Sequence, residues 1–259
     1  MTLARRFVAK LERWPATRQA LRVAALLLLC AACLQLVFAA RIGLMNVLDP
    51  QSTSFQRSEA WRLLVDKHQV RWSQDWVNAD RISPHLKRAV IASEDAGFAD
   101  HGGVDWESIE KAWARNQRAE ARAETLARRQ PERSTTAKLV GGSTISQQLA
   151  KNLFLSGERT ALRKAQELVL TLMLEALLSK QRILEIYLNN VEWGEGVFGA
   201  QAAARHYHRV DAARLGPEQA ARLAVMLPAP KRFEKLPGSA YVAGRAATIA
   251  ARMGAVSLP

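Results

Sequence analysis

Four carboxylates stand close together in one glycine-rich stretch, "SEDAGFADHGGVD", residues 93–105. They are Glu94, Asp95, Asp100 and Asp105, with His101 among them. Acids at this density can bind a metal ion, solvate a surface turn or carry acid–base chemistry. A calcium loop is the weakest of the three interpretations, because the alternating Asp/Asn pattern that ends in a glutamate is absent. Spacing alone supports catalysis and a structural turn equally.

A helix is expected to end at the first two of these acids. In "SPHLKRAVIASED", Ser83 is suited to cap the helix and Pro84 to occupy its first position, and small apolar residues follow at helical spacing. Such a helix places Glu94 and Asp95 at its carbonyl end, where the partial negative charge disfavours an ionised carboxylate. We therefore expect a raised proton affinity there, as a general base or acid requires.

A second motif, "GGSTISQQLAKN" at residues 141–152, is a glycine-rich lead into another helix. Thr144 and Gln147 match a capping box. Thr144, Gln148 and Lys151 follow at i, i+4 and i+7, on one helical face. Free N–H groups at a helix N-terminus attract phosphate, so this motif predicts an anion site.

A third motif, "RKAQE", places Arg163 and Glu167 four residues apart. Standing alone, such a pair is an ordinary surface salt bridge that contributes a few tenths of a kcal/mol to helix stability. The pair indicates a functional site only in combination with the other two motifs.

The charge of the chain favours anionic partners. Lys and Arg outnumber Asp and Glu by 37 to 24 in 259 residues, a formal net charge of +13. Nucleic acid, an acidic membrane surface and phosphates all fit that sign. The apolar stretch "VAALLLLCAACLQLVFAA", residues 23–40, favours the membrane, because a helix of that length runs roughly 27 Å, close to the hydrocarbon thickness.

The residues before this stretch predict its orientation. They are rich in Arg and Lys, which places the N-terminus in the cytoplasm and everything after Arg41 on the far side. A cleaved signal peptide is the alternative, but the apolar run is long and "VFAAR" lacks a small-x-small cleavage site. Cys30 and Cys33 form a C-x-x-C inside the stretch and are interpreted as small apolar filler, so the exported part has no cysteine and depends on its core.

The rest of the chain is predicted to be mainly α. Helical periodicity recurs in "LRKAQELVLTLMLEALLSK" and "QRILEIYLNN", with Ser179 as a cap between them, and neither a βαβ alternation nor an internal repeat is present. Residues 115–138 differ, because they carry many charges and almost no large apolar side chain. We expect a flexible basic flap there, in preference to a solvated helix.

The motifs in this order, followed by "WGEGVFGAQAAARHY", resemble the family 51 glycosyltransferases, the peptidoglycan glycan polymerases, over residues 82–230. The resemblance implies a mainly α, lysozyme-like glycosyltransferase domain with a mobile, membrane-dipping jaw and a single N-terminal transmembrane helix. It also implies an inverting enzyme that joins lipid II into β-1,4-linked strands and releases undecaprenyl diphosphate. The sequence to Pro259 lacks the ordered S-x-x-K, S-x-N and K-T-G motifs, so we expect a monofunctional biosynthetic member without transpeptidase activity.

The same resemblance implies a domain organisation and a location. The expected parts are a basic cytoplasmic tail (1–22), a transmembrane helix (23–40), a membrane-proximal region (41–81) and a glycosyltransferase domain (82–259) with a mobile basic insertion (115–138). The protein is expected in the bacterial inner membrane, with its catalytic domain in the periplasm. Expected partners are lipid II, the lipid-linked glycan chain, the membrane and cell-division or cell-wall synthesis proteins, and no nucleic acid.

Residue roles also follow from the resemblance. Glu94 is implied as the base that takes the proton from the acceptor 4-hydroxyl, and Glu167 as the second essential carboxylate, which positions donor groups. The implied substrate-binding residues are Asp95, Phe98, His101, Thr144, Gln148, Lys151, Asn152, Arg163 and Lys164. A divalent cation, Mg²⁺ or Mn²⁺, is a further expectation at the diphosphate.

Two alternative functions fit parts of the sequence. A lysozyme-like hydrolase would also carry a glutamate at a helix end, but it has no use for Lys151 and Arg163 on a diphosphate or for a membrane anchor. A non-catalytic membrane scaffold of the cell-division apparatus would explain the anchor and the charge, but not Glu94 together with Glu167.

Overall fold

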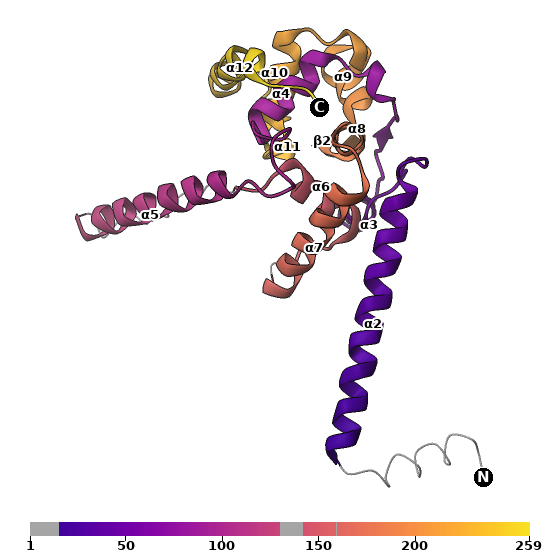
Figure 1. Ribbon diagram of the computed structural model, residues 1–259. Helices are drawn as coiled ribbons and strands as arrows, with labels where there is room; N and C mark the ends of the chain where they lie inside the picture. Colours follow the sequence, from indigo (N-terminus) through magenta and orange to yellow (C-terminus); the bar gives the residue numbers. More distant parts are fainter. Residues whose placement is uncertain (1–15, 130–141, 159) are drawn as a thin grey trace.

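The computed structural model describes residues 16–129, 142–158 and 160–259. A helical body carries two helices that extend away from it, α2 on one side and α5 on another (Figure 1). The helices are α2 (Ala16–Leu44), α3 (Ser54–Lys67), α4 (Pro84–Glu94), α5 (Trp106–Arg129), α6 (Ile145–Phe154), α7 (Ala161–Leu177), α8 (Lys180–Asn190), α9 (Ala200–His208), α10 (Pro217–Met226), α11 (Pro230–Phe233) and α12 (Ala240–Arg252). Short 3-10 turns are η1 (Ala79–Arg81), η2 (Ala212–Arg214) and η3 (Met253–Ala255). The prediction of a mainly α fold is confirmed.

Helix α2 is longer at both ends than the predicted span of residues 23–40. It is apolar and long enough to cross a membrane from Arg18 to Leu44. The extension arises because the flanking residues are also helix formers, and a helix need not end where the hydrocarbon does. Seven residues of the predicted tail, 16–22, are therefore helical, and residues 1–15 lie outside the described part.

Local capping signals set the starts of the helices around the site. Ser83 accepts a hydrogen bond from the His85 N–H at the start of α4, with Pro84 in the first turn, as predicted. Thr144 and Gln147 form the predicted capping box of α6. Ser179 caps α8 by accepting from the Arg182 N–H.

The body consists of two packed groups of helices that meet at the end of α4. In the first group α4 packs against α10 and α12; in the second, α6 packs against α3 and α7. Leu86 and Val90 of α4 are fully buried, and the alanines Ala220 and Ala224 of α10 let the helices approach closely. Helix α8, whose residues are largely buried, contacts α6 and α7 of the second group and also packs against α9.

A small sheet in the order β1–β3–β2 closes one side of the body. Strand β1 (Ser73–Gln74) pairs in parallel with β3 (Val197–Phe198), and β2 (Glu192–Gly194) pairs with β3 in antiparallel fashion. Gly196 precedes β3 with φ +74°, and a Cβ there would lie 2.1 Å from the carbonyl oxygen of Arg71. Only glycine fits that position.

Residues 41–81 were predicted as a membrane-proximal region, and the structure shows that they also pack into the helical body. Helix α3 packs against α6, and β1 pairs with β3, which lies more than one hundred residues later. The described part of this region is therefore integral to the body, and no boundary is seen at residue 82. The prediction missed this because both contacts are made by partners distant in sequence.

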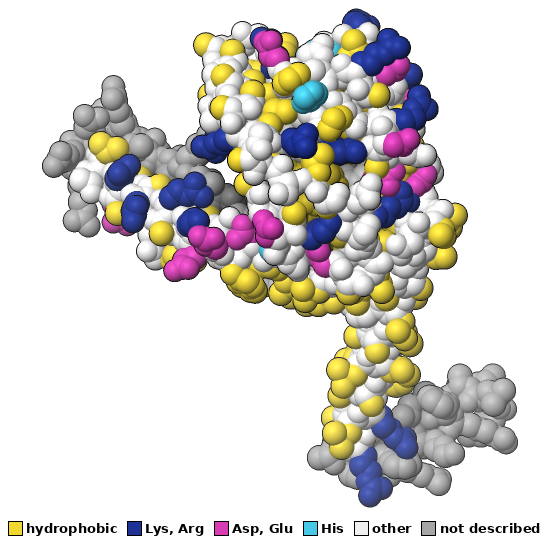
Figure 2. Space-filling model, turned by 45° about the horizontal axis from the view of Figure 1, so that its top comes forward, with side chains coloured by type: hydrophobic (Ala, Val, Ile, Leu, Met, Phe, Trp, Pro, Cys, Tyr) yellow, Lys and Arg dark blue, Asp and Glu magenta, His cyan; other side chains and the backbone are white. Residues whose placement is uncertain are grey.

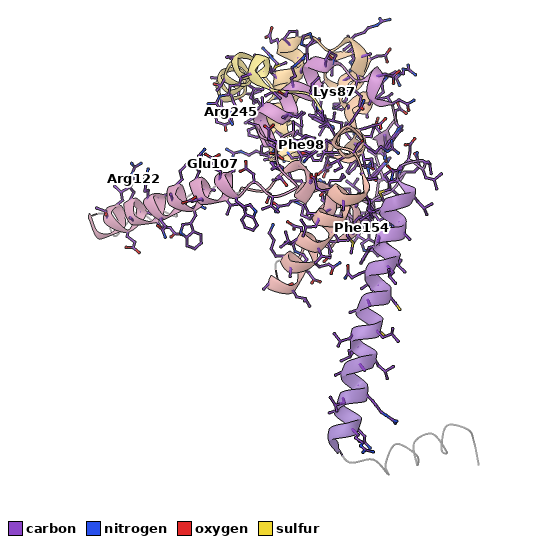
Figure 3. The ribbon with its side chains drawn as sticks, viewed as in Figure 1. Lys87, Phe98, Glu107, Arg122, Phe154 and Arg245 are labelled. Carbon is purple, nitrogen blue, oxygen red and sulfur yellow. The ribbon has the colours of Figure 1, made fainter. Side chains whose placement is uncertain are left out.

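The predicted flap at residues 115–138 is wrong for its first part, because residues 115–129 form the outer part of helix α5. Ala, Arg and Glu dominate this stretch and are strong helix formers, so the helix needs no apolar contacts along its outer length. Trp106 and Trp113 are 71% and 67% exposed, and Glu107 and Arg122 project from the extended helix in Figure 3. Residues 130–138 lie outside the described residues.

Candidate active site

Glu94 is the last residue of α4, and its carboxylate meets α6. Its Oε2 accepts a hydrogen bond from Nε2 of Gln148 at 3.0 Å. Burial raises the pKa of Glu94, and the nearby Asp95 adds to this, while Gln148 and the charge of Arg245 on α12 (labelled in Figure 3) act in the opposite direction. The direction agrees with the sequence-based expectation, but the largest cause is burial and not the helix end.

Tyr187 of α8 fixes the orientation of this amide. Its hydroxyl donates to Oε1 of Gln148 at 2.9 Å, which leaves the Gln148 nitrogen to face Glu94. Burial raises the pKa of Tyr187 well above its usual value, so the phenol stays protonated and remains a donor. Sequence reasoning missed this residue, because in "QRILEIYLNN" it has the helical spacing of an ordinary core aromatic.

Asp95 is 7% exposed and joins the first motif to the second. Its Oδ1 contacts Nε2 of His101 at 2.8 Å, and its Oδ2 accepts from the Ile145 N–H, the first residue of α6, at 2.9 Å. Burial raises the pKa of Asp95, and the hydrogen bonds from His101 and Ile145 lower it. Asp95 is therefore a positioning residue that holds α6 against the end of α4.

The predicted phosphate site at the N-terminus of α6 is wrong. The Ile145 N–H donates to Asp95, and the Gln147 N–H donates to Oγ1 of Thr144, so a carboxylate of the protein itself occupies the anion position. Thr144, predicted to bind substrate, is 2% exposed and donates its hydroxyl to the Gly103 carbonyl oxygen at 2.7 Å. It caps and anchors the helix.

The remaining residues of the glycine-rich stretch shape the loop. Phe98 is fully buried beneath the ammonium of Lys180, which lies 4.5 Å from the ring centroid, so its place is in the core and not against a ligand. His101 accepts from the Gly103 N–H at 3.1 Å and contacts Asp95 on its other side. Asp105 accepts from the N–H and the hydroxyl of Ser108, bonds that lower its pKa and begin α5.

Six of the predicted residues line one cavity of about 440 Å³ between α3, α6 and α7. They are Gln148, Lys151, Asn152, Arg163, Lys164 and Glu167. Glu94 is not among the residues that line this cavity. Gln148 connects the two, because it borders the cavity and donates to Glu94.

Glu167 is the centre of the charged side of this cavity. It is 3% exposed and pairs with Arg163 at 2.8 Å and with Lys164, so it is not an ordinary surface salt bridge. The Nε of Arg163 is buried without a hydrogen-bond partner among the described residues. Desolvation lowers the pKa of Lys151, Glu167 opposes this, and Arg163 and Lys164 lower it further.

This arrangement suits an anionic ligand better than a bound metal. Within the described ranges, no group of three or more His, Cys, Asp and Glu side chains is close enough to hold an ion. Lys151, Arg163 and Lys164 surround Glu167, and cations of this kind repel a metal. A divalent cation at the diphosphate would take its oxygen ligands chiefly from the ligand itself, and this expectation remains a proposal.

The fold and the site together define a class: a mainly α-helical protein with a half-buried carboxylate of raised pKa, Glu94, beside a cavity lined by three cations, and with an apolar helix long enough to cross a membrane. Comparisons with known proteins agree. The sequence model of the family described as Transglycosylase matches residues 63–254.

Similar proteins carry the same family name. The chain is 52% identical, over 225 residues, to the biosynthetic peptidoglycan transglycosylases of Burkholderia vietnamiensis and Burkholderia multivorans, which covers 87% of this chain and 85% of each relative. It is 50% identical over 226 residues to the protein of that name from Paraburkholderia phytofirmans, covering 87% of both chains. The chain therefore belongs to the transglycosylase family. The predictions of the family, of its lysozyme-like fold and of a glycosyltransferase are confirmed.

Proposed function

We propose that this peptidoglycan transglycosylase polymerises lipid II into β-1,4-linked glycan strands, with Glu94 as the base and the α6–α7 cavity as the site of the diphosphate leaving group. The observation that carries the proposal is the position of Gln148. Its side chain touches Glu94 and also borders the cavity of Lys151 and Arg163, so the base and the cations lie on either side of one amide.

In the proposed reaction, the Glu94 carboxylate takes the proton from the 4-hydroxyl of the acceptor sugar. The freed oxygen attacks the anomeric carbon of the donor chain, and the bond from that carbon to the diphosphate breaks on the opposite face, which inverts α to β. Undecaprenyl diphosphate leaves with the electron pair, and Glu94 later returns its proton to water. The raised pKa of Glu94 favours proton uptake, as a base near neutral pH requires.

The cations act on the leaving group. Negative charge on the diphosphate grows as the anomeric bond breaks, so Lys151, Arg163 and Lys164 stabilise the transition state more than the bound substrate. Glu167 holds Arg163 and Lys164 by its two ion pairs and thereby positions them. A hydrolase of uncharged glycan would gain nothing from these charges.

Helix α2 is proposed as a single-pass anchor in the inner membrane, with the N-terminus in the cytoplasm and the body in the periplasm. Arg18 and Arg22 lie at its N-terminal end, as the positive-inside rule requires. Hydrophobic side chains cover its shaft and the adjoining underside of the body in Figure 2, which suits contact with lipid. Binding to cell-division or cell-wall synthesis proteins remains a prediction.

The test is a gel assay with labelled lipid II. The purified parent is expected to give long glycan strands, and Glu94→Gln none, because the amide is similar in shape but cannot accept the proton. Asp100→Asn is the matched control, since Asp100 is an exposed carboxylate of the same loop, and it should polymerise like the parent. Polymerisation by Glu94→Gln at more than about a twentieth of the parent rate would remove Glu94 as the base, because losing general-base catalysis costs at least ~100-fold.

A further inference from the structure

The membrane helix α2 and the cavity helix α7 run side by side in the same direction. Gln35 of α2 bonds to Gln166 of α7, and Nδ2 of Asn46, just past the end of α2, donates to the Leu177 carbonyl oxygen at 3.0 Å. The partners are 131 residues apart in both contacts, so the two segments are parallel and keep one register. Over the 11 residues between these contacts the helices lie together for roughly 16 Å.

The contact at Gln35 is a reciprocal amide pair. Nε2 of Gln35 donates to Oε1 of Gln166 at 2.9 Å, and Nε2 of Gln166 donates to Oε1 of Gln35 at 3.1 Å. Gln35 interrupts an otherwise apolar stretch that has the composition of a membrane span. Water does not compete for such a pair in lipid, and an unpaired amide there is costly.

The same face of α2 also contacts the end of α6. The ring of Phe38 meets that of Phe154 edge-on, with centroids 5.3 Å apart, and the guanidinium of Arg41 lies 5.2 Å from the Phe154 centroid. Phe154 is labelled beside α2 in Figure 3. Gln35, Phe38 and Ala39 of α2 are half-buried and Ile42 is fully buried, and these four residues follow the i, i+3, i+4, i+7 spacing of one helical face. Helix α2 therefore touches both helices that carry the cations of the cavity.

We propose that Gln35 is a positioning residue for the diphosphate cavity. Gln166 is next to Glu167 in α7, and Arg163 lies one turn earlier, so the amide pair fixes the rotation and height of the helix that carries both. The membrane span thus sets the level of the cavity relative to the lipid, in addition to holding the protein at the membrane. This inference rests on the proposed function of the cavity.

The test uses the full chain in lipid nanodiscs, with Gln35→Leu, Gln166→Leu and the double variant. Each single variant is expected to lower kcat with lipid II about threefold to tenfold, the usual range for one interhelical hydrogen-bonded contact in a membrane, because the displaced cations act mainly on the transition state. The double variant should be no worse than either single one, because the pair is already broken. Leu36→Ala, at a lipid-facing position beside Gln35, is the matched control and should behave like the parent.

Gln35→Glu separates positioning from a merely structural role. A protonated carboxyl keeps both hydrogen bonds to Gln166, whereas a carboxylate only accepts. The ratio of kcat in this variant to kcat in the parent should therefore fall as pH rises. Because this comparison is made at different pH values, it also tests whether Gln35 positions the cavity if the leucine variants fail to fold.

Three results would overturn the inference: parent-like kcat in Gln35→Leu, additive effects in the double variant, or a parent-like pH dependence in Gln35→Glu. A loss of thermal stability with unchanged kcat would show that the pair is only structural. Lys151→Ala distinguishes this inference from the proposed function. If Lys151→Ala leaves lipid II polymerisation intact, the cavity is misassigned; if it is inactive while the Gln35 variants match the parent, only the role of Gln35 fails.

Discussion

Tyr187 donates its hydroxyl to Oε1 of Gln148 at 2.9 Å, and through this one bond it decides which end of the Gln148 amide faces Glu94. A flipped amide would present its oxygen to the Glu94 carboxylate, and two acceptors repel each other. The buried phenol therefore orients the amide that contacts Glu94, the proposed base, without touching Glu94 itself.

Tyr187→Phe is expected to lower kcat about tenfold and to destabilise the protein by about 1 kcal/mol, because Oε1 of Gln148 loses its donor. The Gln148 hydrogen bond lowers the pKa of Glu94, so weakening it should move the acid limb of the pH–rate profile to higher pH. Tyr207→Phe, which removes a hydroxyl bonded to the Trp193 carbonyl oxygen outside the site, is the control. An unmoved acid limb in Tyr187→Phe would contradict the proposed control of Glu94.

Glu94→Gln is expected to be more stable than the parent at pH 8. The folded-state pKa of Glu94 lies above its ordinary value of 4.5, so the folded protein binds the proton more tightly than the unfolded chain does. The stability that the Glu94 carboxyl contributes is present below pH 4.5 and is lost as the pH rises through its raised folded-state pKa. Glutamine does not titrate, so the variant does not undergo this loss. Thermal unfolding at a series of pH values should show that the stability of Glu94→Gln relative to the parent increases as pH rises. Asp100→Asn is measured for comparison. The opposite trend would mean that the Glu94 pKa is not raised.

Lys151→Ala is expected to reduce kcat about 100-fold to 1000-fold, the range for removing one preorganised contact to a developing charge. Binding of moenomycin, a phosphoglycolipid donor mimic, should weaken, while uncharged glycan oligomers should bind the variant and the parent alike. Lys235→Ala changes an exposed lysine outside the cavity and serves as the control. Unchanged turnover and unchanged affinity for the mimic would place the diphosphate elsewhere.

A reporter fused after Pro259 should be active only outside the cytoplasm, because the basic residues before α2 hold the N-terminus inside. Alkaline phosphatase and green fluorescent protein, which function on opposite sides of the membrane, give the two readouts. Fluorescence without phosphatase activity would reverse the orientation and remove access to the proposed substrate.

Much of the helical framework could be predicted, because its signals are local. The caps at Ser83, Thr144 and Ser179 satisfy N–H groups two or three residues away, and such pairs are visible as short patterns in a sequence. Helix α5 was missed for the opposite reason. Its outer half was judged by its lack of apolar residues, although intrinsic propensity alone favours a helix there.

The site could be predicted only in part. The cations that line the cavity belong to two neighbouring motifs and could be anticipated as a group. The role of Asp95 could not be predicted, because its partner is the backbone N–H of Ile145, 50 residues away. The role of Tyr187 could not be predicted either, because its hydroxyl bonds to a residue of another helix, 39 residues away in the chain. A sequence pattern shows which groups are present, but such long-range partners depend on the packing.

The bonds from Thr144 to Gly103 and from Ile145 to Asp95 join the two ends of the chain segment that contains α5. The segment therefore begins and ends at one clamped point, and its length enters the stability mainly as a logarithm, about 0.6 kcal/mol for each doubling. Residues 115–129, the outer part of α5, can then be regarded as an exchangeable cassette. Shortened arms, fluorescent labels or foreign helices inserted there should leave the spacing of Glu94 and Lys151 unchanged, which makes this segment the natural place to attach a probe to the working enzyme.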